Sequence, residues 1–214
     1  MTRHAVRTGT IVLALTLLGI VGWSPPASAA TVDLDVSAAT ITIAGNTFSL
    51  NDTGGPCPKA DTLQLVTDSP SAGQLTLTGG WTSVLRLGTP PSGPWYQIDV
   101  SVLTGTMSYS GGPSSYAVAT VAPNHLILRM DIYEVGEGDC AKDDRKCVLH
   151  GRFVSTTGTY TGALPAAASG DTLSLSAATN VAGGLNMVVS TCNAPWVSWA
   201  GQSATLNPFS FVVP

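Results

Sequence analysis

The sequence has little charge. Asp, Glu, Lys and Arg make up 10% of its 214 residues, against about a quarter in an average soluble domain. Low charge together with 44% apolar residues excludes a disordered chain, which needs the opposite balance. The formal net charge of -4 provides no basic patch, so we expect no nucleic-acid partner.

Long apolar runs are missing beyond the first thirty residues. A helix needs about twenty consecutive apolar residues to cross a bilayer. We therefore expect no transmembrane helix in the chain after its leader is removed. The length leaves room for a single domain with a sizeable buried core.

Motifs of nucleophilic and metal-dependent catalysis are also missing. The sequence contains no GxSxG, no HExxH and no Ser-x-x-Lys. Only His125 and His150 lie beyond the leader, and each is typical of an ordinary strand or turn histidine. A triad can assemble from distant residues, so a hydrolase remains an alternative, but the sequence predicts no catalytic residue and no cofactor.

The first thirty residues are typical of a secretory signal peptide. Arg3, His4 and Arg7 form a positive start, residues 11–21 are apolar, and Ala27-Ser28-Ala29 supplies a small-x-small cleavage pattern. A cut after Ala29 or Ala30 would leave a chain with a net charge of about -6, because two of the nine basic residues lie in the leader. We expect a secreted bacterial protein, released or held at the cell envelope.

Four cysteines lie beyond the leader, and an even number in an exported chain predicts two disulfides. Cys140 and Cys147 flank six residues with little apolar content, so a local bridge is the natural way to order that loop. Cys57 and Cys192 then pair by exclusion. Since there is neither a CxxC pair nor a nearby pair of histidines, we expect no metal site at the cysteines.

Residues 31–214 read as one all-β domain. Apolar and polar residues alternate with period two in short segments, and turn signals separate them every 8–12 residues. This pattern predicts an antiparallel β-sandwich or barrel of about a dozen short strands, stapled by the two disulfides. The clearest alternation covers residues 126–132, and residues 147–157 are expected to form its hairpin partner.

Glycine-rich dipeptides predict the reversals between strands. Gly45-Asn46 is expected to turn residues 32–44 back into 47–50, and Gly79-Gly80 to turn 75–78 back into 81–87. Residues 163–168 are the only candidate for a short turn of helix.

Aromatic residues near turns are the candidate binding residues, because exposed rings can stack on sugar faces. Trp is also a routine core residue of β-sandwiches, and on a regular strand Trp196 and Trp199 would face opposite sides. The candidates are Trp81, Trp95, Tyr96 and Trp199.

Six acidic residues fall between positions 131 and 144. Oxygen-rich loops can hold Ca²⁺, but the spacing matches no EF-hand, and a solvated hairpin tip explains the cluster without a ligand. Binding of Ca²⁺ by this segment is left open.

Together these features predict a secreted, non-catalytic β-domain that acts as a binding or structural module, with a glycan as one candidate ligand. One alternative is a secreted hydrolase that uses carboxylate and histidine side chains. The other is a barrel-type carrier of a small apolar ligand, which requires an interior cavity.

Overall fold

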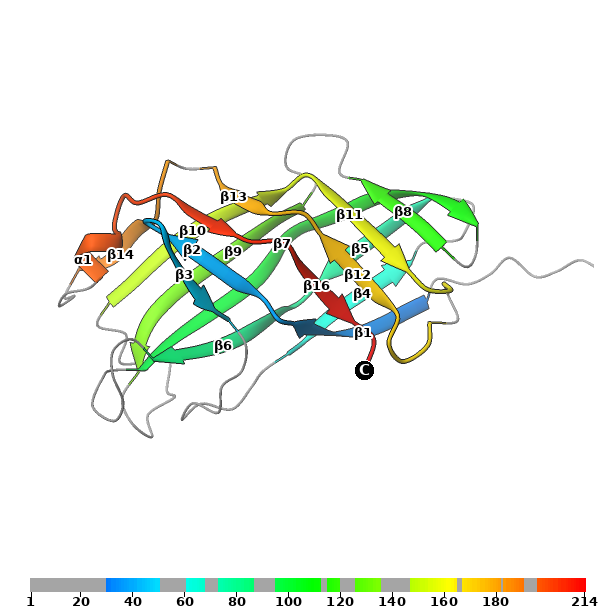
Figure 1. Ribbon diagram of the computed structural model, residues 1–214, viewed down its shortest axis with the longest axis horizontal. Helices are drawn as coiled ribbons and strands as arrows, with labels where there is room; N and C mark the ends of the chain where they lie inside the picture. The colour runs from blue at the N-terminus through cyan, green and yellow to red at the C-terminus, as the bar shows by residue number, and fades with distance from the viewer. Residues whose placement is uncertain are drawn as a thin grey trace, which may run out of the picture.

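The computed structural model describes residues 30–50, 61–67, 73–86, 95–112, 115–119, 126–135, 147–164, 167–181, 183–190 and 196–214. The described residues form a curled antiparallel sheet of sixteen strands, a half-barrel, with a single short helix (Figure 1). The all-β prediction is confirmed, with more strands than the expected dozen. Within this part of the chain no helix has the length and apolar character to cross a membrane.

The strands are short except for β7, which runs through both halves of the molecule. The elements are β1 (Ala30–Ser37), β2 (Thr40–Ile43), β3 (Asn46–Ser49), β4 (Leu63–Thr67), β5 (Gln74–Thr78), β6 (Gly80–Arg86), β7 (Trp95–Gly112), β8 (Ser115–Ala119), β9 (Leu126–Val135), β10 (Cys147–Ser155), β11 (Thr157–Thr161), β12 (Thr172–Leu175), β13 (Ala178–Asn180), β14 (Asn186–Ser190), α1 (Trp196–Trp199), β15 (Ala204–Leu206) and β16 (Phe209–Val212).

In one half of the molecule the hydrogen-bonded strands form a closed ring that begins and ends at β7. Their order is β7, β5, β4, β1, β16, β12, β11 and β8, and β8 pairs with β7 again. Every pairing in this ring is antiparallel. A closed ring has no free strand edge, which removes the usual site of edge-to-edge association.

The other half is a curled sheet. It runs from β6 through β7, β9 and β10, whose far edge pairs with both β13 and β14, and continues through β15 and β2 to β3. The two ends of this sheet approach each other, because Ser83 of β6 donates a hydrogen bond to the carbonyl oxygen of Leu50, just after β3.

At five places where the chain crosses from one half of the molecule to the other, it contains one residue more than a regular period-two alternation would have. At each, the buried positions switch between odd and even numbers, as from Phe153 and Ser155 to Gly158 and Tyr160. An extra residue bends a strand and increases its twist, and here it keeps the apolar side chains inside across the bend. The adjacent residues that both lie outside the core are Ser37 and Ala38, Leu103 and Thr104, Thr156 and Thr157, Ser176 and Ala177, and Asn207 and Pro208.

Side chains replace the interrupted ladder at this bend. The Ser176 hydroxyl lies 2.9 Å from that of buried Ser155 and accepts hydrogen bonds from the backbone N–H groups of Thr156 and Thr157. Nearby, the Asn207 amide donates to the hydroxyls of Thr40 and Thr42, so polar groups are satisfied where the strands change direction.

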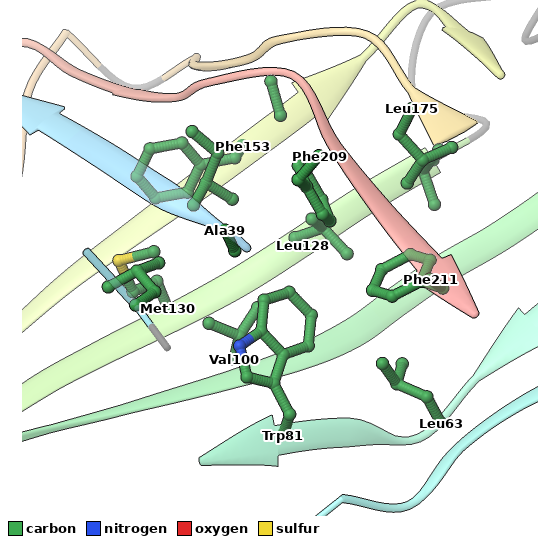
Figure 2. Packing of buried hydrophobic residues seen from close by; sticks show 14 of the residues in the cluster. Ala39, Leu63, Trp81, Val100, Leu128, Met130, Phe153, Leu175, Phe209 and Phe211 are labelled. Carbon is green, nitrogen blue, oxygen red and sulfur yellow. The ribbon is translucent and has the colours of Figure 1, made fainter. Parts of the chain in front are cut away.

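Apolar side chains from opposite walls meet in the interior (Figure 2). The ring of Trp81 on β6 lies 5.7 Å from that of Phe211 and 6.0 Å from that of Phe209, both on β16. The predicted alternation in β9 is confirmed, since Leu126, Leu128, Met130 and Ile132 are all fully buried in this core and β10 pairs with β9 as expected.

The expected reversal at Gly79-Gly80 is wrong. Both β5 and β6 run antiparallel to β7, so the chain continues in one direction past Gly79. Gly79 has φ +87°, and a Cβ there would lie 1.9 Å from the carbonyl oxygen of Thr62. Glycine is needed here because two backbones come close together, and not because the chain turns back.

Three other local expectations change. Residues 32–44 are two strands, β1 and β2, and the β2–β3 turn is centred on Ala44 and Gly45, both with positive φ. Trp196–Trp199 is a helical turn, so the strand argument for opposite faces does not apply. The described residues of 163–168 form no helix.

One carboxylate orders the connection between β11 and β12. Asp171 Oδ2 accepts hydrogen bonds from the N–H groups of Ala168 at 2.8 Å and Ala163 at 3.4 Å, and from the Tyr160 hydroxyl at 3.2 Å. The bond from Ala168 is the main cause that holds the pKa of Asp171 below its usual range; the other two bonds add to it and burial opposes them. Burial, followed by the charge of Asp171, raises the pKa of Tyr160.

We expect Asp171→Asn to lower the melting temperature at neutral pH, and the gap to wild type to narrow in acid. A carboxyl with a lowered folded-state pKa stabilises the fold above its unfolded pKa, about 3.8, and this contribution is lost as the pH falls through the folded value. Thermal melts from pH 7 to about pH 2 measure the gap. Asp33→Asn is the control, because Asp33 is exposed and its one described hydrogen bond is accepted from the Gln64 side chain. A gap that stays constant with pH would contradict the assignment.

Candidate functional site

The outer surface of β6, β7, β9 and β10 carries most of the described charge. On these strands the core residues alternate with polar ones that point away from the interior. Nine Asp, Arg and His side chains are described in the whole structure, and five of them lie on this face. We call this set the polar face: Asp99, Arg129, Asp131, His150 and Arg152.

Strand register places three members of the polar face in one row. Asp99 on β7 is opposite Asp131 on β9, and Asp131 is opposite His150 on β10. Thr82 on β6 extends the row beyond Asp99, and Asn186 on β14 extends it beyond His150. Two carboxylates directly opposite each other destabilise a sheet unless their charges are compensated.

Asp99 is compensated by hydrogen-bond donors. Its Oδ1 accepts from the Thr82 hydroxyl at 2.9 Å and the Gln97 amide at 2.8 Å, and its Oδ2 accepts from the Tyr133 hydroxyl at 2.9 Å. These bonds fix the carboxylate against the sheet.

Asp131 is compensated by two positively charged or chargeable groups. Arg129 Nε donates to its Oδ2 at 2.8 Å, and His150 Nδ1 lies 2.9 Å from its Oδ1. Because a carboxylate only accepts, this contact favours the ring form with hydrogen on Nδ1 and turns Nε2 toward other partners. The side chains of Arg129, His150 and Asp131 are 48%, 22% and 13% exposed, so a ligand could reach all three.

A second, buried pair of side chains lies next to the partly exposed row of Asp99, Asp131 and His150. Gln97 and Tyr133 are opposite each other and buried, and neither is part of the main apolar cluster in the interior. Gln97 Oε1 is a buried acceptor with no hydrogen-bond partner among the described residues. The face therefore combines partly exposed charged groups with a deeper polar layer.

The described contacts of the polar face do not form a catalytic set. His150 contacts the Asp131 carboxylate through Nδ1, and among the described residues no hydroxyl or thiol is hydrogen-bonded to its Nε2. In the same part of the chain, no group of three or more His, Cys, Asp or Glu side chains is placed to hold a metal ion.

The predicted aromatic binding residues lie elsewhere. Trp81 and Tyr96 are buried in the core, and Trp199 is buried in α1 with its ring 5.2 Å from that of Phe48. The backbone of Trp95 begins β7 at the margin of the polar face, but its side chain is outside the described set. The structure does not bring the four together on one surface, and their role in binding stays a prediction.

Several predictions fall outside the described residues. They include His125, three of the cysteines and most of the acidic segment 131–144. Of the fourth cysteine, Cys147, only the backbone at the start of β10 is described. Of the six acidic residues in the segment, only Asp131 has a described side chain.

The alternation within each strand is enough to put Asp99 and Asp131 on the polar faces of their own strands, but it does not bring the two together. The missing information was register, because the residue opposite Asp131 depends on how β7, β9 and β10 align. One feature of the sequence does point to the row: in a chain with little charge, three of its strands each carry charged or titratable residues on the face opposite their apolar residues.

Comparisons with protein-family models, with curated proteins and with solved structures give no match. A function for this protein therefore has to be inferred from the geometry of the polar face.

We expect a measurable coupling between Asp99 and Tyr133. Asp99→Ala removes an acceptor shared by three donors, and should cost about 1–3 kcal/mol of unfolding free energy because one donor is the buried Tyr133 hydroxyl. In the background of Tyr133→Phe the cost should be smaller by at least about 0.5 kcal/mol. Urea denaturation of the four proteins in this double-mutant cycle gives the coupling. Strictly additive effects would show that the contact contributes nothing to stability.

Proposed function

We propose that this protein is an exported, non-catalytic β-domain that binds a glycan through the polar face. The observation that carries the proposal is the in-register row formed by Asp99, Asp131 and His150 across three neighbouring strands. In a chain with 10% charged residues, such a concentration of partly exposed charged groups points to a surface role.

A sugar fits the donors and acceptors of this row. Sugar hydroxyls both donate and accept hydrogen bonds, so one pair of neighbouring hydroxyls can contact a carboxylate and a cationic donor at once. Asp131 and Arg129 present such a pair already held at 2.8 Å. Rigid strands carry all of these groups, which lowers the cost of ordering them on binding.

A hydrolase is the second candidate, because His150 is hydrogen-bonded to Asp131. This contact is the histidine–carboxylate half of a nucleophilic triad. It would need a nucleophile near His150 Nε2, which the described contacts do not supply. The carrier alternative has less support, because the rings of Trp81, Phe209 and Phe211 occupy the interior where a ligand would lie (Figure 2).

We expect the exported protein to bind one or more envelope glycans on an array, and Asp131→Ala and His150→Ala each to weaken binding about 10- to 100-fold. Loss of a hydrogen bond to a charged group costs about 1.5–3 kcal/mol, which corresponds to this range. Asp33→Asn on β1, away from the polar face, is the matched control and should bind as wild type.

The same protein variants distinguish a glycan-binding protein from a hydrolase. Turnover of a glycan or ester substrate that disappears in His150→Ala would replace the binding proposal with the hydrolase. Binding that is equal in Asp131→Ala, His150→Ala and Asp33→Asn would remove the polar face from the ligand site.

We also propose the disulfides Cys140–Cys147 and Cys57–Cys192 in the exported chain. In the chain-entropy account the long bridge should contribute about 4–5 kcal/mol and the short one about 2–3 kcal/mol. Peptide mapping without reductant should recover one fragment for each pair. A fragment that links Cys57 to Cys140 or Cys147 would overturn the pairing.

A further inference from the structure

We infer that the exported chain begins at Ala30, with the leader cut between Ala29 and Ala30. The inference rests on the export part of the proposed function. The sequence permits two cuts, because small residues stand first and third before the bond in both Ala27-Ser28-Ala29 and Ser28-Ala29-Ala30. The two products differ by one alanine.

Ala30 belongs to the folded domain. It is the first residue of β1 and is in register with Thr67, the last residue of β4. The Ala30 N–H donates to the Thr67 hydroxyl oxygen at 3.0 Å, and that hydroxyl is 3.4 Å from the Ala30 carbonyl oxygen.

The Thr67 side chain makes the choice between the two cuts matter. Thr67 is buried, and both described hydrogen bonds of its hydroxyl are to the backbone of Ala30. A cut after Ala30 would remove both partners at once, and a buried polar group without partners is costly. A cut after Ala29 keeps them and leaves Thr31 paired with Val66 as the second position of the ladder.

The chemistry of the cut strengthens the same contact. Hydrolysis of the Ala29–Ala30 peptide bond by a signal peptidase adds water, leaving a carboxylate on Ala29 and a protonated amine on Ala30. The amine is then a charged donor facing the Thr67 hydroxyl, and charge-assisted hydrogen bonds are shorter and stronger than neutral ones.

The test starts from the full-length gene expressed in an exporting bacterium, with intact mass and N-terminal sequencing of the product. A chain that begins at Ala30 supports the inference. One that begins at Thr31 overturns it and leaves the export proposal intact. An uncleaved product retained in the cells overturns both.

A second measurement tests the physical reason directly. Chains that begin at Ala30 and at Thr31 are each prepared with Thr67 and with Thr67→Val, by cleaving an exported tag at the chosen residue. We expect the Thr31 chain to melt about 2–4 °C lower when Thr67 is present, and the difference to shrink below about 1 °C in the Thr67→Val background because the hydroxyl is gone.

Thr159→Val on the exposed side of β11 is the control and should leave the 2–4 °C difference in place. Equal melting temperatures for the two Thr67 chains would contradict the role given to Ala30, whichever residue the secreted product begins with.

Discussion

A strand that bends can keep its apolar side chains inside only if its period-two alternation is reset at the bend. In this protein five passages of the chain undergo that reset, each through one extra residue. Four of them are neighbours, and their register aligns the resets side by side from β10–β11 to β1–β2. The closed ring, the curled second sheet and the shared core all depend on this arrangement.

The same alternation produces the polar face. If Ile98, Met130 and Leu149 point inward, then Asp99, Asp131 and His150 must point outward. The row is thus a by-product of core packing in each strand. Core packing does not explain why the row is charged, because most other outward positions in the described strands carry Ser, Thr or small residues. That contrast is why we propose a binding role for this face.

Carboxylates in this chain organise backbone and side chains locally. Asp171 holds the β11–β12 connection, and Asp61 accepts hydrogen bonds from the N–H groups of Val36 and Leu63, which ties β1 to the start of β4. Asp99 gathers three side-chain donors. Asp131 differs from these, because its partners are cationic or titratable side chains that also reach solvent.

By itself the sequence determined the fold class, the apolar face of β9 and the pairing of β9 with β10, since these depend on local alternation and on a neighbour close in sequence. Tertiary structure decided the course of the chain at Gly79, where a backbone contact with Thr62 and not a reversal explains the glycine. It also decided that Trp81, Tyr96 and Trp199 are buried and that the polar row exists. These features depend on contacts between segments far apart in the chain, and a local pattern contains no information about such register.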